Sequence, residues 1–218
     1  MISLRKMLGQ LFVVMSHTFI RPVYFLIFRK KYGNCKIFRP GAGGYNKYII
    51  SINDTNMLIK KTDFLINLII RIAPPHKGGR DMLLSKRYKL LQNLLNTEFS
   101  RYTLCIQAMR DRLIYVYEEN AQILNENNFS FTKFNDILKA IDILHRQKLF
   151  FVDLHPSNIV VLKNGKYKLI DLDAVEPAIN NKDYAYDYKF FKKHVESWKQ
   201  GKRLKILLDQ AIIKTQKL

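Results

Sequence analysis

The spacing of apolar residues divides the chain into a strand-rich first part and a helix-rich second part. Apolar and polar residues alternate over 45–52, and the stretch is rich in β-branched and aromatic side chains, which is typical of a half-buried strand. A broad apolar face recurs at helical spacing over 80–95. Together with turn residues between them, these patterns predict strands at 36–39, 45–52, 57–60, 101–109 and 113–117, with a helix at 80–95.

The second part predicts helices around one short hairpin. A helix is expected over 131–147, and its end leads through Phe150-Phe151 into a polar loop. Residues 159–162 and 167–170 read as two strands joined by the tight turn Asn164-Gly165. The tail from residue 184 is helical and basic, and its expected buried stripe consists of Phe190, Phe191, Val195 and Trp198. The succession predicts an α+β protein with a cleft between a β-rich lobe, 36–120, and a mainly helical lobe, 121–218.

The N-terminal segment, residues 1–35, allows two interpretations. Residues 8–28 are strongly apolar but include Arg21 and Pro22, and no small-residue cleavage site follows, so neither a secretory signal nor a spanning helix is expected. Burying Arg21 in a bilayer would cost roughly 2.5–3.5 kcal/mol. Basic residues on both sides suit a segment that lies on an anionic membrane surface. The alternative is an amphipathic helix and strand packed on the body of the protein.

The charge of the chain narrows the choice of partners. Lys and Arg outnumber Asp and Glu by 37 to 18 in 218 residues, for a net charge of +19, and the first acidic residue is Asp54. Such an excess favours anionic lipid, phosphorylated sugar or nucleic acid. Nothing resembling a nucleic-acid-binding module is present, so we expect no nucleic-acid partner. The two cysteines form no C-x-x-C pair, which favours a reducing compartment.

Three polar residues in the second part of the chain form a candidate catalytic site. Asp153 is followed five residues later by Asn158, and Asp171 comes thirteen residues beyond. The predicted hairpin would return Asp171 to the side of Asn158, so that an amide and a carboxylate could hold a metal while Asp153 holds an acceptor hydroxyl. The simpler explanation is that these residues form turns and helix caps.

Two features of the first lobe fit a phosphate site. Gly41, Gly43 and Gly44 lie between the first two strands, where their backbone N–H groups can approach a phosphate closely. Alternation along the third strand turns Lys60 inward, towards an anion, and Lys61 towards solvent. The alternatives are a plain flexible loop and two exposed lysines.

With Lys60, Asp153, Asn158 and Asp171 in this order, the chain resembles the protein-kinase-like superfamily from about residue 36 to residue 187. Within it, the passages 36–39, 58–60, 161–166 and 169–172 look most like the bacterial lipopolysaccharide core kinases, which phosphorylate inner-core heptose. The resemblance implies a bilobal protein-kinase-like fold, ATP and Mg²⁺ as cofactors, and a lipid-linked anionic oligosaccharide as acceptor. It also implies a cytoplasmic location, peripheral to the inner membrane.

The resemblance also implies residue roles. The three glycines would cover the phosphates, and Lys60 would contact the α- and β-phosphates. Asp153 would be the catalytic-loop aspartate, while Asn158 and Asp171 would hold magnesium. The backbone at Glu118 would meet adenine where the chain crosses between the lobes.

Several positions depart from the family pattern. The usual Glu partner of the lysine is absent, and Asp81 is the candidate replacement. Phe151 stands where the catalytic loop usually has His. His155 stands where protein Ser/Thr kinases have Lys, and kinases of sugars and antibiotics often have His there. Asp187 either anchors the catalytic loop or lies in solvent.

Three functions remain open from the sequence. The first is an ATP- and magnesium-dependent kinase that phosphorylates a hydroxyl of a core heptose. The second is a pseudokinase or binding module, favoured by the missing Glu. The third is a small atypical protein kinase, which would also be basic and short.

Overall fold

The computed structural model describes residues 11, 14–37, 46–52, 54–61 and 84–215. The chain divides into two compact units, which are Met1–Gln92 with Cys105–Tyr117, and Asn93–Leu104 with Glu118–Leu218. The chain therefore passes between the units three times. The domain limits predicted at residues 35 and 120 stay predictions.

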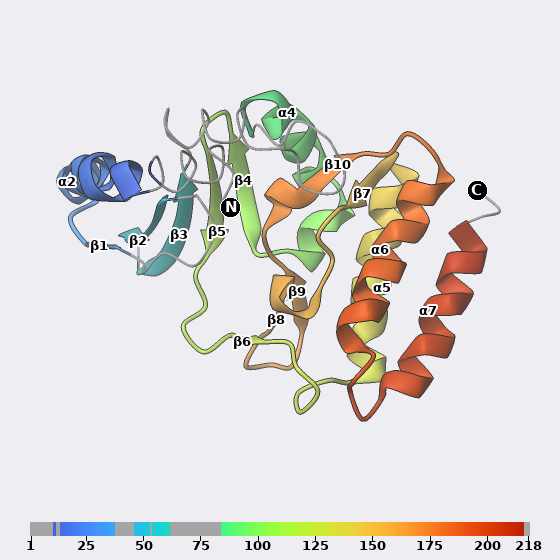
Figure 1. Cartoon of the computed structure of the whole chain (residues 1–218). Helices are drawn as coiled ribbons and strands as arrows, with labels where there is room; N and C mark the ends of the chain where they lie inside the picture. Colours follow the sequence, from blue (N-terminus) through green and yellow to red (C-terminus); the bar gives the residue numbers. More distant parts are fainter. Residues whose placement is uncertain (1–10, 12–13, 38–45, 53, 62–83, 216–218) are drawn as a thin grey trace. The chain divides into compact units, whose positions relative to one another are not determined.

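The first unit contains one antiparallel sheet of five strands, in the order β1-β2-β3-β5-β4 (Figure 1). Asp54 makes the turn between β2 and β3 with a positive φ of 58°, which Asp tolerates better than most residues. The helix predicted over 80–95 is present as α4, Leu84–Leu95, within the described residues. The strands are β1 Cys35–Ile37, β2 Asn46–Ile52, β3 Thr55–Lys61, β4 Cys105–Met109 and β5 Arg112–Val116.

A helix from the N-terminal segment packs on this sheet. A short π-helical turn, η1 (Ser16–Ile20), leads into α2 (Arg21–Tyr32). Phe28 meets Tyr48 edge to face at 5.0 Å between ring centroids, and Ile50 and Ile59 complete the buried cluster. The Tyr48 hydroxyl donates to the Arg21 carbonyl at 3.1 Å. One face of α2 therefore packs on the body of the protein, as one of the two interpretations of the N-terminal segment predicts. In the part of the chain that the structure describes, no helix has both the length and the apolarity needed to cross a bilayer.

The prediction for Lys61 is wrong. Its side chain is only 5% exposed, because its ammonium group pairs with Asp111 in the β4–β5 turn. The same group lies 4.4 Å from the ring centroid of Tyr24 on α2. Alternation does place Lys60 on the opposite face of β3, where it is also buried. Alternation along β3 predicted that the face carrying Lys61 is open to solvent. In the structure, α2 and Asp111 cover this face, and neither could be placed there from the sequence around β3.

The strand predicted over 101–109 begins later than expected. Residues before it form a 3₁₀ turn, η2 (Glu98–Tyr102), which Thr97 caps by accepting a hydrogen bond from the Phe99 N–H at 3.2 Å. Phe99 is fully buried, and this burial anchors the turn. The Thr103 hydroxyl then donates to the Leu169 carbonyl at 2.8 Å, so this stretch belongs to the second unit.

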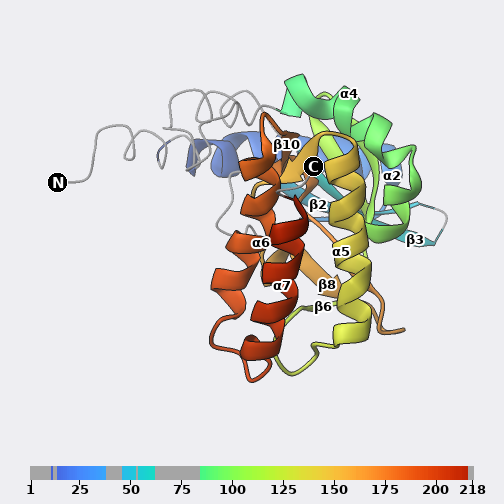
Figure 2. The same ribbon diagram turned by 90° about the vertical axis from the view of Figure 1, so that its right-hand side faces the viewer.

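The described residues of the second unit form three helices, short 3₁₀ turns and two small sheets (Figure 2). Phe134 of α5 stacks on Phe191 of α6 at 5.0 Å, and α6 packs along α7. Phe191 and Val195 are buried as predicted, but Phe190 and Trp198 are only half-buried. The helices are α5 Phe131–Arg146, α6 Asn181–Val195 and α7 Gly201–Thr215. The sheets are β6-β8-β9, from Gln122–Ile123, Ile159–Val161 and Tyr167–Leu169, and β7-β10, from Leu149–Phe151 and Val175–Pro177.

Candidate active site

The loop that carries Asp153 begins at the end of a buried strand. β7 pairs with β10, and Phe151 lies opposite Val175 in the register. The ladder continues one residue further, because the Val152 N–H donates to the Ala174 carbonyl at 2.9 Å. Asp153 is therefore the second residue after a rigid strand, where its position is set by the backbone.

Asp187 holds the start of this loop from α6. Both of its carboxylate oxygens accept from the Phe151 N–H, at 2.9 and 3.1 Å, and one accepts from His145 Nε2 at 2.9 Å. The side chain is fully buried, and this burial raises the pKa of Asp187 to about 6. Of the two interpretations of Asp187, the structure therefore selects the anchor.

His145, on the last turn of α5, is a site residue that sequence reasoning missed. Its Nδ1 atom has no hydrogen-bond partner among the described residues, and the ring donates to the Asp187 carboxylate through Nε2. The available signal was a polar side chain on the apolar face of α5, next to the buried Leu144.

Asp153, His155 and Asn158 form one hydrogen-bonded group. The Asn158 amide nitrogen donates to the Asp153 backbone carbonyl at 2.8 Å and to its carboxylate at 3.2 Å. His155 Nε2 lies 3.3 Å from the same carboxylate, and the Ser157 hydroxyl lies 2.6 Å from Nδ1. Because a carboxylate only accepts, Nε2 carries the hydrogen and Nδ1 accepts from Ser157. The turn η3, Pro156–Asn158, brings these groups together.

The β8–β9 hairpin then returns the chain to Asn158, as the sequence predicted. Ile159 pairs with Leu169, and the Ile170 N–H donates to the Asn158 carbonyl at 2.9 Å. Gly165 makes the turn with φ 75°, a conformation that suits glycine. Asp171 follows with φ 60° and ψ 45°, in the left-handed region, and opens the turn η4, Leu172–Ala174. Asp adopts this conformation more readily than most residues.

The donor atoms suit a magnesium ion. Since the Asn158 amide nitrogen is committed to Asp153, its oxygen is the atom left for a cation. Asp171 follows Ile170, whose backbone N–H is bonded to the Asn158 carbonyl, and would supply the second oxygen ligand. Two oxygen donors from protein, with phosphates and water filling the other positions, match the way proteins bind Mg²⁺ with nucleotides.

The remaining predicted residues lie elsewhere or outside the description. Lys60 is 4% exposed on β3 of the first unit. Glu118 is exposed, is the first residue after the boundary between the units, and its carbonyl accepts from the Ala121 N–H at 3.1 Å. Gly41, Gly43, Gly44 and Asp81 lie outside the described residues.

A five-stranded antiparallel unit, followed by a helical unit that carries the hairpin between Asn158 and Asp171, defines the protein-kinase-like fold. The crystal structure of choline kinase LicA from Streptococcus pneumoniae matches it with a TM-score of 0.50. That match covers 89% of this chain and 90% of the other, at 12% identity, and concerns the fold.

Sequence comparison finds a shorter likeness. A stretch of 68 residues is 32% identical to the dual specificity protein kinase zak2 of Dictyostelium discoideum. It spans 29% of this chain and 11% of that relative. No protein-family model matches the chain.

Proposed function

We propose that the protein is an ATP- and magnesium-dependent kinase that phosphorylates a hydroxyl of a lipopolysaccharide core heptose. The observation that carries this proposal is the Asp153–Asn158 hydrogen bond beside the hairpin that returns to Asp171. It supports an acceptor carboxylate and two metal ligands held in one place. The name of the structural neighbour, a choline kinase, and that of the partial relative, a protein kinase, support phosphoryl transfer.

The chain's own residues would work by positioning and electrostatics. Asp153 orients the attacking hydroxyl and accepts its proton, and the Nε2–H of His155 keeps this carboxylate in place. Asn158 and Asp171 would hold magnesium, which would neutralise charge on the phosphates. Lys60 would contact the α- and β-phosphates, and Gly41, Gly43 and Gly44 would cover them. The backbone at Glu118 would contact adenine, and Asp81 would pair with Lys60.

The N-terminal helix supports an acceptor that is embedded in a membrane. While Tyr24 and Phe28 face the sheet, large apolar side chains on the rest of α2, on η1 and on the residues before it are exposed. The chain has no acidic residue before Asp54. An apolar face with basic residues at its end suits the interface of an anionic bilayer. The exposed apolar residues are Leu11, Val14, Met15, Phe19, Val23, Leu26 and Ile27, and the exposed basic residues are Arg29, Lys30 and Lys31.

The test of the proposal is Asp153→Asn, assayed for phosphate transfer to deacylated lipopolysaccharide core. The asparagine oxygen can still accept from Asn158, so the fold and nucleotide binding should persist. We expect turnover to fall by about 10²–10⁴-fold, as is typical when a positioned acid–base group is lost. Full activity of this variant would remove Asp153 from its proposed role.

A further inference from the structure

One face of α6 carries aromatic side chains that are not part of the core. Tyr186, Phe190 and His194 are spaced four residues apart and therefore share a face. Tyr186 stacks on Phe190 at 5.5 Å between centroids with 18° between the ring planes, and Phe190 lies 4.6 Å from His194. His155 of the candidate loop stacks on His194 at 5.3 Å. We call these four side chains the α6 aromatic row.

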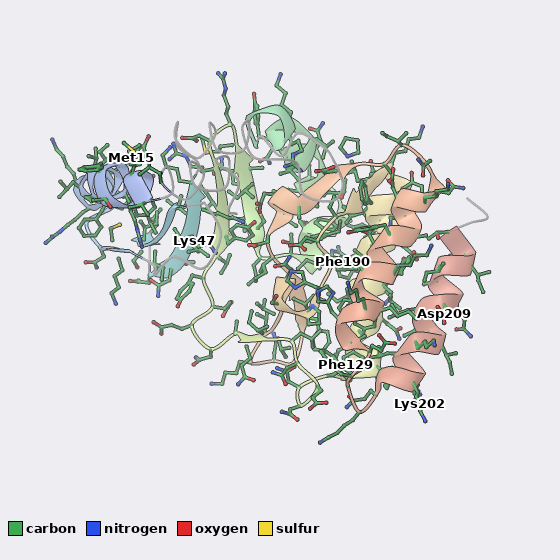
Figure 3. The ribbon with its side chains drawn as sticks, in the orientation of Figure 1. Met15, Lys47, Phe129, Phe190, Lys202 and Asp209 are labelled. Atoms are coloured by element: carbon green, nitrogen blue, oxygen red, sulfur yellow. The ribbon has the colours of Figure 1, made fainter. Side chains whose placement is uncertain are left out.

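The row remains accessible while the neighbouring positions of α6 are buried. Ala185, Tyr188, Phe191 and Val195 point into the core. Tyr186 and Phe190 are half-buried, and His194 is exposed; Phe190 is labelled in Figure 3. Phe190 is tilted by 55° to His194 and by 61° to His155, so the row offers a partly exposed aromatic surface with its rings at several angles.

The row ends at Asp153. His155 lies 3.3 Å from the Asp153 carboxylate through Nε2. Burial, and after it the charge of Asp153, raises the pKa of the Tyr186 hydroxyl. A molecule lying on the row would therefore reach the carboxylate that is proposed to orient the acceptor.

Polar groups along the row suit a ligand with several hydroxyls. His194 Nδ1 donates to the Phe190 carbonyl of the same helix at 2.9 Å. Nε2 of that ring is therefore the nitrogen left for a ligand. The Ser157 hydroxyl lies against His155, the ring that stacks on His194. Lys189 and Lys193 are exposed on the same helix, and their charge favours an anionic ligand over a cationic one.

From this geometry we infer that the α6 aromatic row is the acceptor subsite, on which the C–H face of a pyranose ring stacks with one hydroxyl at Asp153. The inference rests on the proposed kinase function and names its substrate class by chemistry. The positively polarised C–H bonds of a sugar ring face the negative face of an aromatic ring.

The test uses Phe190→Leu, which keeps an apolar side chain but removes the ring, and Phe129→Leu as its control. Phe129 is another half-buried aromatic residue of the same unit and packs on Trp198, away from the row (Figure 3). We expect Phe190→Leu to raise the KM for deacylated, dephosphorylated core oligosaccharide by about 3- to 10-fold, the range of one aromatic contact. The KM for ATP should stay within about twofold, and the control should change neither value.

A binding measurement separates this inference from the function on which it rests. In an Asp153→Asn background, saturation-transfer NMR of the same oligosaccharide reports contact without turnover. Loss of signal on Phe190→Leu supports the subsite even if the wild type transfers no phosphate, an outcome that would defeat only the proposed function. Unchanged oligosaccharide affinity in Phe190→Leu would overturn the subsite. Displacement of the oligosaccharide by choline, with choline lost on the same substitution, would also overturn it in favour of a trimethylammonium ligand.

Discussion

At the scale of single residues, Asp187 connects three elements of the second unit. Its carboxylate on α6 accepts from the Phe151 backbone on β7 and from His145 on α5. Removing the carboxylate would leave a buried N–H and a buried ring nitrogen without partners, each of which costs about 1–3 kcal/mol. The position of the Asp153 loop therefore depends on a residue that contacts no substrate.

The raised pKa of Asp187 gives a pH dependence with a defined sign. Its pKa is about 6 in the folded protein against an ordinary value of 3.8, so the folded state binds this proton more tightly. The stabilising contribution is complete below about pH 4 and is lost as the pH rises through about 6. Relative to Asp187→Asn, we expect the free energy of unfolding of the wild type to fall by on the order of 1–3 kcal/mol across that window.

Urea unfolding followed by circular dichroism at several pH values measures this difference. Asp142→Asn is the control, because that carboxylate is 43% exposed on α5 and pairs with Lys214 at 3.1 Å. The control should follow the wild-type slope. If the free energies of unfolding of the wild type and of Asp187→Asn change in parallel with pH, the pH dependence does not come from Asp187.

Local patterns predict residues whose partners are near in the sequence. Asn158 and Asp171 could be paired in advance, because a short hairpin joins them. Asp187 could not be assigned, because its two partners lie 36 and 42 residues away. Lys61 was wrong for the same reason, since Asp111 lies 50 residues further on.

At the scale of elements, strong periodicity was sufficient for most of the fold. The alternation in β2 and the apolar faces of α4 and α5 were sufficient to predict these elements from the local sequence alone. The start of β4 could not be predicted, because apolar residues continue upstream into η2. There the burial of Phe99 and the Thr97 cap favour a tight turn over an extended strand.

The outer face of α2 gives an element-scale prediction. Val23→Asp with Leu26→Asp places two charges on side chains that are 54% and 62% exposed, so stability should change little. We expect binding to vesicles of phosphatidylcholine with one-third phosphatidylglycerol to fall about tenfold or more, because two apolar side chains no longer enter the interface. Co-sedimentation measures the bound fraction.

Ile206→Asp is the matched control for this pair, because Ile206 is 61% exposed on α7. This variant should bind vesicles as the wild type does. If the α2 variant also binds vesicles like the wild type, the outer face of α2 does not enter the bilayer. Any vesicle binding would then come from the basic residues at the end of the helix.

At the scale of the whole molecule, the order of the elements predicted an α+β protein, whereas the protein-kinase-like fold was implied by the resemblance that Lys60, Asp153, Asn158 and Asp171 carry. Five strands with one helix come before a helical part, and this succession is read directly from the periodicity. The interleaving of the two units was not predictable, because the pairing of Thr103 with Leu169 depends on a hydrogen bond across 66 residues.

Nucleotide binding should stabilise the whole chain only in the presence of metal. If Asn158 and Asp171 bind Mg²⁺ together with phosphates, ATP should raise the melting temperature when Mg²⁺ is present and have little effect in EDTA. Asp171→Asn should abolish the metal-dependent part of the shift. It should leave the melting temperature without ligand nearly unchanged, because asparagine also tolerates the left-handed conformation of this residue.

Differential scanning fluorimetry with and without Mg²⁺ measures both effects. An equal ATP shift in EDTA would favour a pseudokinase that binds nucleotide without metal. A large loss of stability in Asp171→Asn without ligand would instead give this residue a structural role.

The early crossing of the chain has a consequence for synthesis. Phe99 and Thr103 leave the ribosome long before Leu169, the residue that Thr103 must meet. A truncated protein that starts at Glu118 would lack this inserted turn, and its second unit would expose the cavity that Phe99 fills. Such a fragment should aggregate, whereas one that also retains residues 93–104 through a short engineered linker should stay in solution.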